Sequence, residues 1–113
     1  MTFEEYQKQA LTTLLSDQEF GEFNAQFIAQ VLGLVGESGE FADKIKKRIR
    51  NDAGRVTPEE RTELLKELGD VLWYVNSLSH LLGSSIAEVA QMNMDKLNGR
   101  KSRGVIKGAG DNR

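Results

Sequence analysis

Apolar residues spaced three and four positions apart dominate two long segments of this sequence, and no other feature constrains the fold as strongly. The first segment runs from about Asn24 to Arg50 and the second from Pro58 to Leu82. This spacing places side chains on one face of an α-helix, whereas a half-buried strand alternates at every second residue. No such alternation appears in the sequence. The chain is therefore predicted to be all-α.

Local signals indicate where the second of these helices begins and ends. Pro58, the single proline, follows Thr57 and precedes two glutamates. This order is typical of an N-cap, a proline at the first helical position and an acidic first turn. Gly83 lies just beyond the last apolar position, where glycine commonly ends a helix. The helix is predicted to fill the stretch between Thr57 and Gly83.

Two shorter helices complete the prediction. One runs from about Thr2 to Leu15, and the other begins after a serine cap at Ser84 or Ser85. With 113 residues the chain is long enough for one ordinary domain and too short for two, so residues 1–113 are expected to form a single domain. The expected architecture is a four-helix bundle with short connections.

The composition excludes several classes of protein and site. The sequence has no cysteine, which excludes disulfides, thiolate metal ligands and a cysteine nucleophile. No apolar run approaches the roughly 20 residues that a membrane span needs, and the polar start "MTFEEYQKQA" is unlike a secretory signal. The formal net charge of -2 argues against general nucleic-acid binding. We therefore expect a cytoplasmic protein with no membrane and no nucleic-acid partner.

The charged residues are unevenly distributed along the chain. Residues 1–43 hold eight acids and one base, residues 44–50 ("KIKKRIR") hold five bases, and residues 94–113 hold six bases and two acids. An acidic part beside basic segments suits a polyphosphate that carries a metal ion. Solvated helix faces, with cations near a helix C-terminus, explain the "KIKKRIR" run equally well.

An eight-residue pattern, Leu-x-x-Glu-x-Gly-acid-apolar, occurs once in each long helix. Its copies are Leu34–Phe41 and Leu64–Val71. In heptad terms Glu37 and Glu67 take a core position between apolar neighbours, and a second acid follows three residues later on the adjoining edge of the same face. If the two helices pack antiparallel, four carboxylates meet across their seam. These acids are Glu37, Glu40, Glu67 and Asp70.

Four carboxylates at one seam repel one another and are costly to desolvate unless they bind cations. Oxygen ligands suit hard divalent ions, so Mg²⁺ is expected, with Mn²⁺ as an alternative. A di-iron site would use Glu-x-x-His, whereas the only histidine, His80, has Ser77 at that spacing and is expected to be an ordinary packed or surface residue. Gly39 and Gly69 each precede an acid, where a missing side chain would let helices or a ligand approach closely.

With these motifs the chain resembles the MazG-type, all-α nucleoside triphosphate pyrophosphohydrolase family, whose signature is Glu-x-x-Glu followed further along by Glu-x-x-Asp. The similarity extends through "GLVGESGE", "KELGDVLWYV" and "MNMDKLNGRKSRG". The resemblance implies that the four acids of the repeat are catalytic Mg²⁺ ligands. It also implies a homodimer or homotetramer that hydrolyses (deoxy)nucleoside triphosphates to the monophosphate and pyrophosphate, with a house-cleaning role in the nucleotide pool.

Three positions near the acids are candidates for contacts with the substrate. Lys44 lies one turn after Glu40 and is expected either to reach a phosphate or to pair with Glu37 or Glu40. Trp73 and Tyr74 follow the second copy of the repeat. Each is expected to stack on a nucleobase or to pack in the core.

On the last helix Asn93, Lys96 and Arg100 form a stripe with spacings of three and four. By the resemblance, Asn93 and Lys96 match polar and basic positions near the nucleotide. The stripe is predicted to bind phosphate, with pairing on a solvated face as the alternative. The glycines of the closing "KGAGDNR" would let its backbone approach a ligand closely, and Lys107 and Arg113 are candidates to bind anions. Fraying of this terminus is the alternative.

The sequence thus predicts a Mg²⁺-dependent nucleoside triphosphate pyrophosphohydrolase. Two alternatives stay open: a non-catalytic helical oligomerisation or interaction module, in which the acids pair with "KIKKRIR" of a neighbouring subunit, and a nucleic-acid binder that uses the basic tail. A broad apolar surface on the first long helix favours an oligomer. Its residues are Phe27, Ile28, Val31, Leu32, Leu34 and Val35.

Overall fold

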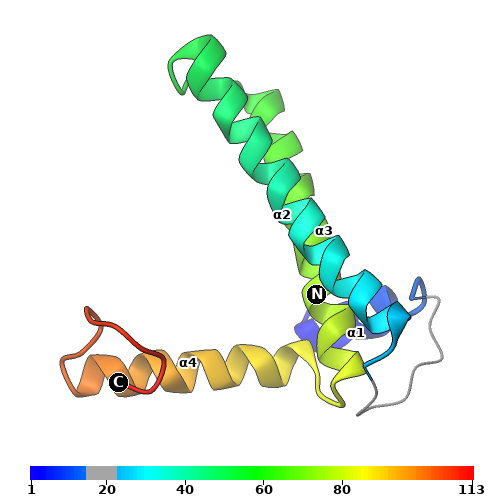
Figure 1. Ribbon diagram of the computed structural model, residues 1–113, viewed down its shortest axis with the longest axis vertical. Coiled ribbons are helices and arrows are strands. Elements are labelled where there is room, and N and C mark those ends of the chain that lie inside the picture. Colours follow the sequence, from blue (N-terminus) through cyan, green and yellow to red (C-terminus); the bar gives the residue numbers. More distant parts are fainter. Residues whose placement is uncertain (15–22) are drawn as a thin grey trace.

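The computed structural model describes residues 1–14 and 23–113, and within these ranges the chain is helical and contains no strand. Four helices follow one another (Figure 1): α1 (Phe3–Leu11), α2 (Ala25–Asp52), α3 (Pro58–Leu81) and α4 (Ile86–Ser102). The predicted all-α class is confirmed. None of these helices is long and apolar enough to cross a membrane.

The two long helices, α2 and α3, lie side by side and run in opposite directions (Figure 1). Asn24 caps α2, because its side-chain oxygen accepts a hydrogen bond from the backbone N–H of Phe27 at 3.0 Å. At the far end α2 stops where Ala53 and Gly54 take left-handed backbone angles, with φ of 55° and 81°. The antiparallel packing that the acid repeat requires is therefore present.

The predicted limits of α3 are also confirmed. Thr57 and Glu60 form a capping box: the Thr57 hydroxyl accepts from the Glu60 N–H at 3.1 Å, and the Glu60 carboxylate accepts from the Thr57 N–H at 3.3 Å. A cap of this kind stabilises a helix by about 1 kcal/mol. Gly83, with φ of 76°, lies just past the end of α3, and Ser85 is the serine that caps α4.

The short helix α1 packs against α3 and α4, close to the turn that joins them (Figure 1). It ends at Leu11, earlier than predicted, and Leu15 lies outside the described residues. From this junction α4 extends away from the α2/α3 hairpin as a separate arm (Figure 1). In the ranges that the structure describes, no contact links α2 to α4.

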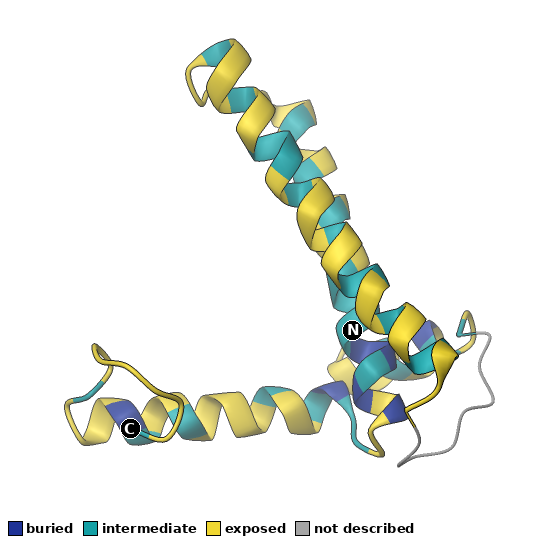
Figure 2. Ribbon diagram, viewed as in Figure 1, coloured by how far each residue is buried: buried dark blue, intermediate teal, exposed yellow. Residues whose placement is uncertain are grey.

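Few side chains are fully buried within one copy of the chain. Among the described residues, the buried apolar ones are Ala10, Leu81 and Ile86, at the junction of α1, α3 and α4 (Figure 2). The radius of gyration is 17.0 Å, whereas a compact chain of this length has about 13 Å. The folded chain leaves a large apolar surface of α2 uncovered. Its exposed residues are Ile28, Val31, Leu32 and Val35.

Candidate metal centre

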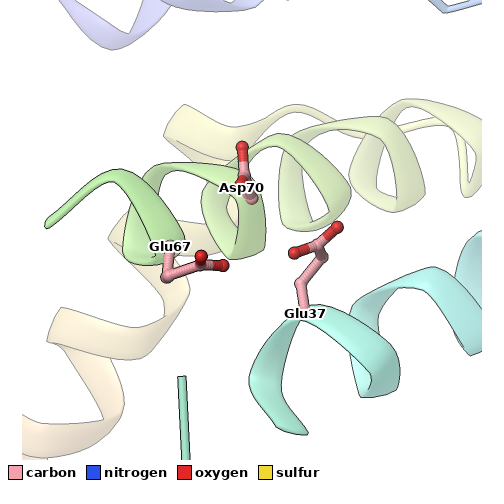
Figure 3. A group of neighbouring side chains, drawn as sticks. All are labelled: Glu37, Glu67 and Asp70. Atoms are coloured by element: carbon pink, nitrogen blue, oxygen red, sulfur yellow. The ribbon is translucent and has the colours of Figure 1, made fainter. Parts of the chain in front are cut away.

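Three of the four predicted metal ligands lie together in the seam between α2 and α3. Glu37, Glu67 and Asp70 each place one carboxylate oxygen within 4.8 Å of the others (Figure 3). Glu37 comes from α2, whereas Glu67 and Asp70 lie about one turn apart on α3. We call these residues the three-acid group. The heptad register of the repeat, combined with antiparallel packing, brings them together.

The fourth acid, Glu40, is exposed and lies outside the three-acid group. Its charge nevertheless acts on Glu37. Burial raises the pKa of the Glu37 carboxyl, and the negative charges of Glu40, Asp70 and Glu67 raise this pKa further. The acids in the seam are therefore not fully neutralised by basic side chains. The repulsion among these acids acts on Glu37.

Two oxygens of the three-acid group are buried and have no hydrogen-bond partner in the described structure: Oε2 of Glu37 and Oε2 of Glu67. Such an unpartnered buried acceptor destabilises the folded chain, and more so when it is charged. A cation held beside both oxygens would remove this cost. Since all the donors are carboxylate oxygens, which Mg²⁺ and Mn²⁺ prefer, the residues present fit the predicted ion.

Lys44 also contacts the three-acid group, but its partner is an acid that the sequence did not indicate. Its Nζ lies 2.7 Å from Oε1 of Glu67, across the seam, so the partner is neither Glu37 nor Glu40 of its own helix. The hydrogen bond and the charge of Glu67 raise the pKa of Lys44. In this structure Lys44 neutralises an acid, so its contact with a phosphate stays a prediction.

The glycines of the repeat do not bring the two helices closer together. A Cβ at Gly39 or Gly69 would meet no atom within 4 Å in the described structure, so the helix-packing half of that prediction is wrong. The close approach occurs instead at Gly33, where the ring of Tyr74 lies in the space that a Cβ would need. Open space beside the acids remains available to a ligand or a second copy.

Trp73 and Tyr74, which follow Asp70 on α3, contact residues outside the three-acid group. The Trp73 indole N–H donates to the hydroxyl of Thr13 at 2.8 Å, and the two rings meet edge to face with centroids 5.0 Å apart. Both side chains are only partly buried, so a base-stacking role stays a prediction. No pattern in the sequence points to Tyr6 of α1, yet burial and the charge of Asp70 raise the pKa of its phenol.

The predicted stripe on α4 lies on the arm that points away from the hairpin (Figure 1). Asn93 and Lys96 line an open groove of about 370 Å³, together with Asp111 of the tail. Lys96 pairs with Asp111 at 3.1 Å. Arg100 is buried and donates to the backbone oxygen of Asp111 at 2.6 Å. The structure thus does not bring the stripe to the three-acid group of the same chain.

Three further residues with a sequence-based prediction lie outside the acid repeat: His80, Arg113 and Lys107. His80 is exposed, as one of the two expectations for it required. Arg113 donates to the backbone oxygens of Val105, Ile106 and Gly110 and so fastens the tail to itself rather than presenting a free cation. Lys107 is exposed, and its predicted contact with an anion stays a prediction.

Comparisons with known proteins agree with the geometry of the seam. The MazG nucleotide pyrophosphohydrolase domain model matches residues 26–105, which contain all four acids of the repeat. The chain is 52% identical over 82 residues to the "Gene 37 protein" of Mycobacterium phage L5, covering 73% of this chain and 72% of the phage protein. No solved structure matches the chain.

Proposed function

We propose that this chain, which belongs to the MazG nucleotide pyrophosphohydrolase domain family, hydrolyses (deoxy)nucleoside triphosphates to the monophosphate and pyrophosphate with Mg²⁺. In the cytoplasm it would remove surplus or non-canonical nucleotides from the pool. The observation that carries the proposal is the three-acid group, with its two buried carboxylate oxygens that lack partners. Burying several carboxylates together is unfavourable in free energy unless a bound cation neutralises them.

Each acid has a separate task in this proposal. Glu37, Glu67 and Asp70 would hold the cation, since their oxygens converge. A bound divalent cation neutralises charge on phosphate oxygens and lowers the pKa of a coordinated water. Glu40, exposed beside Glu37 and outside the three-acid group, would accept the proton of the attacking water. The water oxygen bonds to the α-phosphorus, the bond to the bridging oxygen breaks, and pyrophosphate leaves.

Contacts with the rest of the substrate are assigned from position. Lys44 lies at the three-acid group and would contact phosphate oxygens. Trp73 and Tyr74, one turn beyond Asp70, would stack on the base. The family resemblance, not the acids, selects the α-phosphorus. Hydrolysis in ¹⁸O-water is expected to label the monophosphate, whereas label in pyrophosphate, or orthophosphate as the first product, would contradict this choice of bond.

We further propose that the active form is a homodimer or homotetramer. The exposed apolar face of α2 and the radius of gyration of 17.0 Å support this, because an isolated chain of this shape would leave much apolar surface in water. In an oligomer Asn93 and Lys96 of the α4 stripe of one copy would reach the substrate at the seam of another, whereas Arg100 holds the tail of its own chain. A monomer in light scattering at micromolar concentration would refute the assembly.

The decisive experiment is a panel of nucleoside and deoxynucleoside triphosphates with Mg²⁺, scored for monophosphate and pyrophosphate, with Glu67→Gln as the matched inactive control. Release of pyrophosphate by the wild-type protein alone supports the proposal. No turnover of any triphosphate, by protein that is folded and oligomeric, would contradict it.

One observation favours the rival function, a helical interaction module. Lysines already neutralise some acids, as the 2.7 Å pairs of Lys44 with Glu67 and of Lys47 with Asp43 illustrate. A thermal melt separates the two proposals. A metal site should raise the melting temperature at millimolar Mg²⁺ or Mn²⁺, whereas a module held by ion pairs should not respond beyond the effect of ionic strength.

A further inference from the structure

Two lysines on α2 make ion pairs of the same length but in different surroundings. Lys44 lies 2.7 Å from Glu67, whose side chain is 12% exposed, and Lys47 lies 2.7 Å from Asp43, whose side chain is 43% exposed. The Lys47 pair lies along one helix on its surface. The Lys44 pair crosses the seam and uses a member of the three-acid group.

This arrangement makes Glu67 a shared ligand. Oε1 of Glu67 is bound to the Lys44 ammonium, while Oε2 is buried with no partner. A divalent cation that used Glu67 would stand within a few ångströms of the ammonium, and two cations at that separation in a partly dehydrated seam repel strongly. The ammonium on Oε1 and a metal on Oε2 would use different oxygens, but their mutual repulsion sets the pair with Lys44 against the bond to a metal.

We propose that Lys44 is a built-in counter-ion of the metal site, which opposes the divalent cation at Glu67 through charge repulsion and moves away from this carboxylate when the cation binds. Lys44 thereby sets the affinity of the site for the ion. It also keeps the seam partly neutralised when no ion is bound. The inference rests on the proposed metal-dependent function and adds to it a residue that controls loading of the metal.

The structure provides a place for the released side chain. Lys44 is 40% exposed, and it lines an open cavity of about 280 Å³ between α2 and α3. Lys47 and Arg48 line the same cavity from α2, and Glu63 lines it from α3. The ammonium can therefore leave Glu67 and remain beside the site, where Glu63 offers a second acid.

The test compares Lys44→Met with Lys47→Met, which removes the same charge from the same helix one turn away. Affinity for Mn²⁺, without nucleotide, is measured by calorimetry. Lys44→Met is expected to bind Mn²⁺ about three- to tenfold more tightly than wild type, and Lys47→Met to remain within about twofold, because surface pairs contribute little. Lys44→Met should also melt at a lower temperature than wild type without metal and gain more on adding Mn²⁺.

A second measurement uses the wild-type protein, so it does not depend on the folding of a variant. The side-chain ammonium signal of Lys44, assigned in ¹⁵N NMR by its absence from Lys44→Met, should shift toward that of a free lysine as Mg²⁺ is added, and the Lys47 signal should stay in place. Mg²⁺ binding with an unmoved Lys44 signal, or Mn²⁺ binding that Lys44→Met leaves unchanged or weakens, would overturn the inference alone. A wild-type protein that binds neither ion would overturn the proposed metal site as well.

Discussion

The two copies of the acid repeat, Leu34–Phe41 and Leu64–Val71, share their sequence pattern but differ in electrostatic environment. In both, the first acid is half-buried in the seam and the second is exposed. Glu67 nevertheless has a lysine at 2.7 Å, whereas Glu37 is surrounded by acids that raise its pKa. Local sequence determines where an acid sits on its helix, and the opposite helix determines whether that acid is neutralised.

The difference originates in the segments that come directly after the two copies in the chain. The first copy precedes "KIKKRIR", whose Lys44 comes to lie opposite Glu67 in the antiparallel pair. The second copy precedes "LWYVNSLS", which contains no base that could lie opposite Glu37. One copy therefore supplies a cation to the other and receives none in return, which leaves Glu37 as the acid most in need of a metal ion.

The largest expected effect removes the metal ligands themselves. Glu37→Gln, Glu67→Gln and Asp70→Asn should each lower turnover at least about 100-fold, because each deletes a charge from the site that holds the cation. Pyrophosphate release from dCTP with Mg²⁺ is the measurement, and circular dichroism confirms that the helices persist. Near wild-type activity in Glu37→Gln and Asp70→Asn would show that the three-acid group is not the catalytic site.

Glu40→Gln sharpens the contrast between acids inside and outside the three-acid group. Loss of a proton acceptor should lower the maximal rate by about 100-fold. Since Glu40 lies outside the three-acid group, Mg²⁺ affinity should change much less than in Glu67→Gln. Rates at saturating Mg²⁺ and calorimetric Mg²⁺ titrations separate the two effects. A Glu40→Gln variant whose rate recovers fully with more Mg²⁺ would make Glu40 a ligand instead of a base.

Three glycine-to-alanine variants test the space around the two copies. Gly33→Ala would collide with the Tyr74 ring and should lower the free energy of unfolding by about 1–3 kcal/mol. Gly39→Ala and Gly69→Ala meet open space and should raise this free energy, each by up to about 1 kcal/mol, through better helix propensity. Urea unfolding measures all three. If Gly39→Ala were as damaging as Gly33→Ala, a second copy would have to cover that position.

Much of the hairpin can be predicted from sequence because its determinants are local. The caps at Asn24 and Thr57 act within one turn, and the apolar spacing sets which face of each helix is buried. Once the two helices run antiparallel, the acids of Leu34–Phe41 and Leu64–Val71 have to meet. These features need no knowledge of side chains far away in the chain.

Other contacts depend on residues that are distant in sequence. Lys44 had two acids within reach on its own helix, yet its partner lies across the seam, because the packing of α3 against α2 places Glu67 opposite it. The need for glycine at position 33 arises from Tyr74. Arg100 lies in a regular stripe, but its side chain is used by the tail at Asp111. Spacing on one helix cannot reveal any of these partners.

The metal-free protein should respond with opposite signs to amide substitution in the two copies. Glu37→Gln relieves repulsion among like charges and should raise the melting temperature, whereas Glu67→Gln deprives Lys44 of its partner and should lower it. Each shift should be small, about 1–3 °C. Scanning calorimetry in EDTA, with Glu88→Gln on α4 as an exposed control, measures both. Shifts of the same sign would mean that the two copies do not differ electrostatically as the structure indicates.

The smallest expected effect is a dependence on pH that comes from Glu37. Its folded-state pKa lies above the ordinary value of 4.5, so folding favours the protonated carboxyl. The associated stability is complete below pH 4.5 and is lost as the pH rises through the raised pKa. Binding of Mg²⁺ has the opposite dependence, since it requires the carboxylate. The rise in melting temperature caused by Mg²⁺ should therefore grow as the pH increases through the raised pKa of Glu37 and then level off. In Glu37→Gln, melting without metal should lose this part of its pH dependence. A melting profile without metal that is the same in wild type and Glu37→Gln across this range would show that Glu37 titrates as an ordinary glutamate.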